Sequence, residues 1–214
     1  MNLTYIKIAF ILLLAAVLGS CQTATVSKTS VETPEVVPGV LDEATLTPQE
    51  EAFLQAFQLE TEESWMPAAR AYQDLAESSA QPDRSANYIN SALMNYRAGR
   101  YHIIEPFFEE LKQDDILPTD ENYKAIILSG AYFGIGKIYQ SLLALPDIDD
   151  ISDYRFKALA LNIRSKGVLA IGKPLESVRL RIQIDEYLKT VKEIEKNHDF
   201  IWDALNRISE PAIL

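Results

Sequence analysis

Gly172-Lys173-Pro174-Leu175 is one of three short turn sequences that decide the fold of this 214-residue chain; Gly99-Arg100-Tyr101 and Gly136-Lys137-Ile138-Tyr139 are the others. Each turn separates two apolar segments of helical period, and the three glycines are 37 and 36 residues apart. Glycine commonly ends helices because it adopts the left-handed backbone conformation without a steric penalty. The spacing therefore predicts helical hairpins that repeat about every 36 residues.

Small residues in the helices support the same repeat. Ala92, Ser129 and Ser165 each stand seven positions before one of the glycines, and a small side chain in mid-helix lets a second helix approach closely. Counting back 35 residues from the first glycine leads to Ser64-Trp65, which precedes another apolar segment. A period in the mid-thirties is typical of tetratricopeptide-like repeats, although the strict residues of that motif are not all present. Accidental spacing within another all-helical domain is the alternative.

The first helix of the domain has its own start signal. In Thr47-Pro48-Gln49-Glu50, Thr47 can cap the helix, proline suits the first helical position and Glu50 completes a capping box. Helical periodicity then continues, with no Asn-Gly or Asp-Gly hairpin turn and no sustained strand-like alternation. We predict an all-α domain over residues 47–214, a right-handed solenoid of tetratricopeptide-like helical hairpins with about nine helices.

The N-terminus has the layout of an export signal. Lys7 precedes the apolar run Ile8–Leu18, and Leu18-Gly19-Ser20-Cys21 then contains the only cysteine. An apolar run of 11 residues is too short for a permanent membrane span. The last four residues resemble a bacterial lipobox, which implies a lipoprotein signal peptide over residues 1–20 and lipidation of Cys21. A secretory signal with an accidental cysteine is the alternative.

Residues 21–46 differ in composition from the rest of the chain, being rich in Thr, Ser, Val, Glu and Pro without helical period. We predict a disordered tether that links the domain to the membrane through N-terminal acyl chains. A strand around Val36-Val37 is the alternative, but prolines flank it. Gln22 follows the cysteine, and the resemblance to lipoprotein sorting signals implies the periplasmic face of the outer membrane.

The charge balance and residue types exclude several function classes. The chain has 20 Lys and Arg against 31 Asp and Glu, a net charge of −11, and such a surface repels nucleic acid and anionic lipid headgroups. His102 and His198 have neither a cysteine nor another histidine near them in the sequence, so a zinc or nucleophilic site is not expected. We therefore expect no catalytic residue, no metal, no cofactor, no small-molecule substrate and no nucleic-acid partner.

Repeat solenoids bind partners on the surface formed by the first helix of each hairpin. Counted from the glycine turns, that surface is more apolar than a solvated face should be. The functional interpretation is a groove for a peptide or a neighbouring domain, and the alternative is a register shifted by one position that makes these residues core. The predicted partner-binding residues are Tyr96, Tyr123, Phe133, Asn162 and Lys166.

Four other large side chains have structural interpretations. Trp202 is expected to anchor the last helix in the core, whereas Trp65, near a helix start, suits either the core or an exposed contact. Arg179 and Arg181 are expected to form surface or inter-helix ion pairs with Glu176 rather than to bind an anion.

A more specific resemblance lies near the C-terminal end, where Gly172-Lys173-Pro174-Leu175, Arg179-Leu180-Arg181 and Ile201-Trp202-Asp203-Ala204-Leu205 follow one another. These residues resemble the N-terminal region of the LpoA/LppC-type penicillin-binding-protein activators, which are outer-membrane lipoproteins with a tetratricopeptide-like N-domain. The resemblance implies a class A penicillin-binding protein as partner. In that family an α/β domain like that of periplasmic binding proteins follows and makes most of the synthase contact. This sequence stops at Leu214, so activation by residues 47–214 alone is not implied.

Two functional hypotheses follow. The first is a non-catalytic outer-membrane lipoprotein that supports regulation of peptidoglycan synthesis through protein–protein contact. The second is a scaffold lipoprotein of another envelope assembly machine, such as the one for outer-membrane protein insertion. The helical part of a lytic transglycosylase is a more distant alternative, for which a catalytic glutamate in a groove is not recognisable in the sequence.

Overall fold

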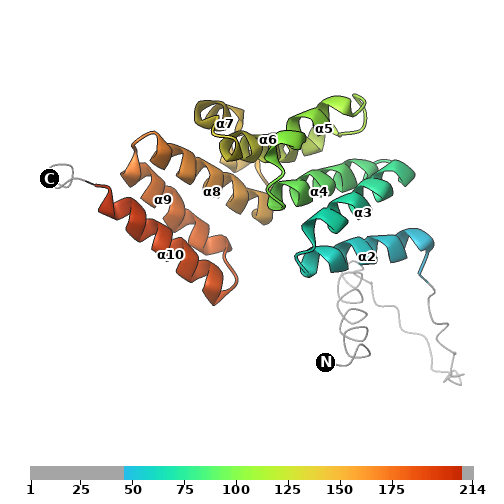
Figure 1. Cartoon of the computed structure of the whole chain (residues 1–214), viewed down its shortest axis with the longest axis horizontal. Coiled ribbons are helices and arrows are strands. Elements are labelled where there is room, and N and C mark those ends of the chain that lie inside the picture. The colour runs from blue at the N-terminus through green and yellow to red at the C-terminus, as the bar shows by residue number, and fades with distance from the viewer. Residues whose placement is uncertain (1–45, 209–214) are drawn as a thin grey trace, which may run out of the picture. The chain divides into compact units, whose positions relative to one another are not determined.

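The computed structural model describes residues 46–208 of the chain (Figure 1). All regular structure in that range is helical, with nine α-helices, four short 3-10 turns and no strand. The prediction of an all-α fold with about nine helices is therefore confirmed, whereas the right-handed solenoid stays a prediction. The predicted signal peptide, Cys21 and nearly all of the predicted tether lie outside the described residues, as do residues 209–214.

Consecutive helices form hairpins in which α2 pairs with α3, α4 with α5, α6 with α7 and α8 with α9, and α10 packs against α9. Figure 1 shows α8, α9 and α10 side by side near the C-terminal end. Helix α6 also contacts α4 and α8, and α3 packs extensively against α4, so neighbouring hairpins pack together. The helices are α2 Pro48–Thr61, α3 Trp65–Ser78, α4 Asp83–Arg97, α5 Ile104–Glu110, α6 Glu121–Gly134, α7 Ile138–Ala144, α8 Tyr154–Ala170, α9 Pro174–Ile184 and α10 Val191–Asn206.

Capping boxes begin both the first and the last described helix. Thr47 accepts a hydrogen bond from the Glu50 backbone N–H, and the Glu50 carboxylate accepts one from the Thr47 backbone N–H at 2.7 Å. This confirms the predicted start signal. Thr190 and Glu193 form the same reciprocal pair at the start of α10, a box that the sequence analysis missed. Each box satisfies backbone donors that a helix start would otherwise leave unpaired.

The three glycine turns have the predicted left-handed geometry. Gly99, Gly136 and Gly172 have φ angles of 73°, 81° and 81°. The residue after each glycine donates its backbone N–H to a carbonyl five positions earlier, at 3.0, 2.8 and 2.9 Å respectively. This is the Schellman arrangement, which satisfies carbonyls at the end of the helix and reverses the chain.

A fourth turn of the same kind lacks a glycine. Glu63 has a φ angle of 57°, and Ser64 donates its N–H to the Leu59 carbonyl at 2.9 Å. Glu63 lies 36 positions before Gly99, so it fills the glycine position of the first repeat. The count of 35 residues back from Gly99 predicted Ser64-Trp65, one position later than the turn residue, because no glycine marks this turn.

Residues at two repeat positions, all of them small except Ile104, fill the space between the helices of the hairpins. The position seven before each turn residue and the position five after it are fully buried in every repeat. In the third hairpin the Ser129 hydroxyl donates to the Ser141 carbonyl at 2.7 Å, and in the fourth the Ser165 and Ser177 hydroxyls are 3.3 Å apart. The residues are Ala56 and Ala68, Ala92 and Ile104, Ser129 and Ser141, and Ser165 and Ser177. The predicted role of the small residues as the contact between helices agrees with this burial.

The two tryptophans lie in different environments. Trp65 is partly buried against the core, and the Arg97 guanidinium lies 5.0 Å from its ring centroid. The prediction that Trp202 anchors the core is wrong, because 65% of its surface is exposed. Helix α10 turns Ala204 and Asn197, seven residues apart on one face, toward the interior, and Trp202 lies about 200° around the helix from Ala204.

Candidate functional site

The five predicted partner-binding residues fall into two groups. Tyr96, Tyr123 and Phe133 are partly buried and pack against the hydrophobic core. The Tyr123 ring lies 4.5 Å from the Phe156 ring, and burial raises the pKa of Tyr96 to about 12. The positions of these three residues agree with the alternative in which they belong to the core, and partner contact through them stays a prediction. Asn162 and Lys166, one turn apart on α8, instead line a pocket.

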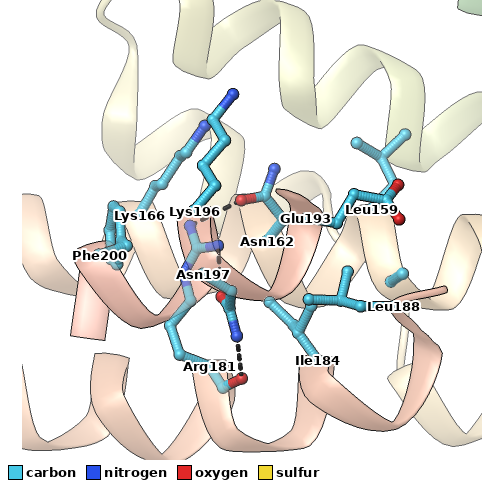
Figure 2. Close-up of a pocket in the computed structure, with 11 residues that line it drawn as sticks. Leu159, Asn162, Lys166, Arg181, Ile184, Leu188, Glu193, Lys196, Asn197 and Phe200 are labelled. Atoms are coloured by element: carbon cyan, nitrogen blue, oxygen red, sulfur yellow. Dashed lines mark hydrogen bonds between the residues drawn. The ribbon is translucent and has the colours of Figure 1, made fainter. Parts of the chain in front are cut away.

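That pocket has a volume of about 320 Å³ and is formed by α8, α9, α10 and the residues between α9 and α10 (Figure 2). One part of its wall is apolar and is made by Ala158, Leu159, Ile184 and Leu188. The other part carries amide, cationic and aromatic groups, with one carboxylate at the edge. Its residues are Asn162, Lys166, Arg181, Glu193, Lys196, Asn197 and Phe200.

Arg181 is the central polar group of the pocket, and only 6% of its surface is exposed. Its guanidinium donates hydrogen bonds to three uncharged acceptors, the Ser165 hydroxyl at 2.7 Å, the Asn197 amide oxygen at 3.1 Å and the Asn162 amide oxygen at 2.6 Å. Its charged carbon also lies 3.8 Å from the centroid of the Phe200 ring. Three helices therefore hold one side chain in a fixed orientation.

The expected ion pairs of the two arginines do not form within residues 46–208. No carboxylate of that range lies within 4.0 Å of the Arg181 guanidinium, and Glu176 instead pairs with Lys173 at 3.4 Å. Arg179 is exposed on the opposite side of α9. The expectation that Arg181 pairs with Glu176 was therefore wrong, because Arg181 follows the buried Ser177 by one helical turn and so faces inward.

Asn197 connects Arg181 to the rest of α9. Its amide nitrogen donates to the Arg181 backbone carbonyl at 2.9 Å and to the Asp185 carboxylate at 2.7 Å. These two bonds orient the Asn197 amide so that its oxygen faces the Arg181 guanidinium in the pocket. No buried side-chain polar atom lacks a hydrogen-bond partner within the described range. The hydrogen bonds of the network are therefore complete, although the charge of Arg181 has no carboxylate partner there.

Positive charge is concentrated at this pocket. Burial lowers the pKa of Arg181 to about 10. Burial also lowers the pKa of Lys166, and the nearby charges of Arg181 and Lys196 lower it further. Figure 2 shows the side chains of Lys166 and Lys196 running beside each other with their amino groups at the same end. The site therefore concentrates cations in a chain whose net charge is −11.

Glu193 does not neutralise these cations. Its carboxylate oxygen accepts hydrogen bonds from the Thr190 backbone N–H at 3.0 Å, the Thr190 hydroxyl at 2.8 Å and the Lys189 backbone N–H at 3.3 Å. Hydrogen bonding from Thr190 lowers the pKa of Glu193 despite the opposing effect of burial. The carboxylate is engaged in the capping box of α10 and forms no ion pair with Lys166, Arg181 or Lys196.

The cations and hydrogen-bond donors that line this pocket are suited to holding a negatively charged group of a ligand.

His198 is exposed and lies 3.3 Å from Asp185, while His102 is exposed on the 3-10 turn Tyr101–Ile103. Among residues 46–208, no group of three or more His, Cys, Asp or Glu side chains is placed to hold a metal ion. None of the helices in that range has both the length and the apolar character needed to cross a membrane.

Asn162 and Lys166, predicted from the sequence as partner-binding residues, line this pocket, whereas sequence reasoning did not place Arg181, Asn197 and Phe200 in one site with them. A signal was present for Arg181, since it lies four residues after Ser177 and three before Ile184, on a face of otherwise small or apolar residues. A charged residue on such a face indicates either an error of register or a buried functional group.

The chain was compared with known protein families, curated proteins and solved structures, and no match was found. The likeness of residues 172–205 to penicillin-binding-protein activators therefore stays a prediction.

Proposed function

We propose that this chain is a non-catalytic lipoprotein that supports the regulation of peptidoglycan synthesis by holding a partner protein in contact with its helical repeats. The observation that carries the proposal is the recurrence of left-handed turns at Glu63, Gly99, Gly136 and Gly172, 36 or 37 residues apart. Stacked hairpins of this period present an extended surface whose usual use is to bind other proteins.

The proposed location is the periplasmic face of the outer membrane, with acyl chains on Cys21 as the anchor. A single fatty chain holds a protein only marginally, whereas several chains give stable attachment. A flexible tether over residues 21–46 would have a root-mean-square span of roughly 25–30 Å. The helical domain could therefore reach a partner that stands away from the bilayer.

The proposed partner is a class A penicillin-binding protein, as the resemblance of the Gly172–Leu175 turn and the Ile201–Leu205 helix implies. The mechanism is tethering and contact, in which no covalent bond is made or broken by this chain. The pocket between α8, α9 and α10 fits that mechanism because its central donor, the Arg181 guanidinium, is held in place by three acceptors and is suited to recognition.

Crosslinking in native cells tests this function. The acylated full-length protein, carrying a C-terminal affinity tag, would be crosslinked and purified, and we expect a penicillin-binding protein among its partners. A Cys21→Ala variant serves as the matched control, because it should lose acylation and membrane attachment and recover less partner. Recovery of insertion-machinery subunits in place of wall synthases would favour the scaffold alternative. An unmodified thiol at position 21 in the mass spectrum of the native protein would contradict the lipid anchor.

A further inference from the structure

Arg181 presents an unusual combination of burial and missing countercharge. It is 6% exposed, and its hydrogen-bond acceptors within the described part of the chain are two amides and one hydroxyl. A buried charge is costly unless an opposite charge or a strong hydrogen-bond network compensates it. Three of the five guanidinium N–H donors are used in these bonds, so two donate no hydrogen bond to residues 46–208.

We propose that this pocket binds a carboxylate carried beside a small apolar side chain, as at the free C-terminus of a peptide that ends in leucine, valine or isoleucine. The proposal deepens the proposed function, since it assigns a chemistry to one contact between this protein and its partner. Arg181 would take the carboxylate, and Lys166 and Lys196 would attract it at the mouth of the pocket.

The cationic side of the pocket specifies the carboxylate. A planar guanidinium held from three helices is suited to a two-oxygen acceptor, because its donors form a rigid fork. Asn162 and Asn197 hold that fork through their amide oxygens at 2.6 and 3.1 Å. The Phe200 ring, 3.8 Å from the guanidinium carbon, covers one face of the group and leaves its edge for the ligand.

The apolar side of the same pocket specifies what accompanies the carboxylate. Leu159, Ile184 and Leu188 line it, and Figure 2 shows Ile184 and Leu188 on the side away from Lys166 and Phe200. The volume of about 320 Å³ lies at the small end of the range for ligand pockets. It therefore suits the last one or two residues of a peptide, because the carboxylate and the apolar side chain of a C-terminal residue are attached to the same α-carbon.

Binding of a labelled peptide to the acylated full-length protein in detergent tests the proposal. The probe is a fluorescein-labelled pentapeptide that ends in leucine with a free carboxylate, and its matched control is the same peptide with a C-terminal amide. Fluorescence anisotropy should show that the acid binds at least about tenfold more tightly than the amide. Equal affinities of the two peptides would overturn the proposal.

Variants at the mouth of the pocket separate binding from folding. Lys166→Gln with Lys196→Gln should weaken binding of the acid peptide by about tenfold, since each partly exposed ion contact contributes about threefold. Lys192→Gln is the matched control, because Lys192 lies on α10 outside the pocket lining, and it should leave affinity unchanged. An equal loss in both proteins would show a general effect of charge and would overturn the proposed site.

Two further probes distinguish the source of the anion. A peptide ending in glycine should bind more weakly than the leucine peptide, and inorganic phosphate should compete poorly with the leucine peptide. Equal binding of the glycine peptide, together with displacement by phosphate, would show a simple anion site and overturn the carboxylate assignment. If no peptide binds while crosslinking still recovers a wall synthase, this inference fails alone. If the leucine peptide binds while crosslinking recovers other machinery, the proposed function fails.

Discussion

The first and the last hairpins use the same repeat positions with different chemistry. Ala56 and Ala68 fill the contact between α2 and α3, whereas Ser165 and Ser177 occupy the equivalent positions between α8 and α9. The alanines offer only packing. The hydroxyl of Ser165 also accepts a hydrogen bond from Arg181 at 2.7 Å. Serine in place of alanine at this repeat position therefore provides an acceptor for a charged group in the interior. The repeat geometry is therefore kept while the chemistry at the repeat positions changes from one hairpin to another.

The largest expected effect comes from overfilling the first hairpin. Ala68→Leu adds three carbons where the side chain is fully buried against α2, and we expect a loss of about 3 kcal/mol in the free energy of unfolding. Urea denaturation followed by far-UV circular dichroism measures it. Ala170→Leu, at an exposed position, is the control and should change stability little. A loss below about 1 kcal/mol for Ala68→Leu would mean that the helices are not tightly packed there.

Removal of the charged group should have a smaller effect on the last hairpin. Arg181→Met leaves the oxygens of Asn162, Ser165 and Asn197 without their donor, and we expect a loss of about 2 kcal/mol. Relief of the desolvated charge opposes that loss. Arg179→Met, two residues earlier and exposed, should stay within about 0.5 kcal/mol of the native protein. A variant at position 181 that is more stable than the native protein would contradict this expectation and show that the desolvation cost of the charge exceeds the gain from its hydrogen bonds.

Substitutions at two of the turns should change the free energy of unfolding by about 1 kcal/mol, downward at Gly172 and upward at Glu63. Gly172→Ala places a side chain at a φ angle of 81° with no atom within 4 Å of the added carbon, so its cost of about 1 kcal/mol is backbone strain alone. Glu63→Gly relieves the same strain at a φ angle of 57° and should raise the free energy of unfolding by a similar amount. Thermal unfolding of both variants measures the two shifts. Shifts of the same sign would contradict the equivalence of the turns.

The smallest expected effect is a pH dependence shared by the first and last helices. Hydrogen bonds from Thr47 and from Thr190 lower the pKa values of Glu50 and Glu193 below their ordinary 4.5. The stabilisation by each capping box is therefore present above pH 4.5 and is lost as the pH falls through the lower pKa of the folded state. Titration by NMR should show both carboxyls with lowered pKa values, and Thr190→Ala should return that of Glu193 toward 4.5. An unchanged pKa of Glu193 in that variant would contradict the assigned cause.

Local signals made the framework predictable from the sequence. The glycine turns and the capping box at Thr47 depend on contacts within six residues, so composition and spacing reveal them directly. The turn at Glu63 was harder because a non-glycine residue takes the left-handed conformation there. Its position follows from the period alone.

The pocket could be predicted only in part because its geometry is not local. Arg181 contacts residues 16 and 19 positions away on two other helices, and periodicity in one helix does not specify which neighbour supplies an acceptor. Trp202 was misplaced for a related reason. The inner face of α10 is decided by Asn197, which bonds to Arg181 and Asp185, whereas hydrophobicity alone favours the tryptophan.

The different surroundings of the two tryptophans give the molecule a built-in pair of optical reporters. Trp65 sits beside Arg97 at the start of α3, and Trp202 points to solvent on α10. Iodide should quench Trp202 more strongly than the partly buried Trp65, so that most of the remaining emission follows melting of the first hairpin.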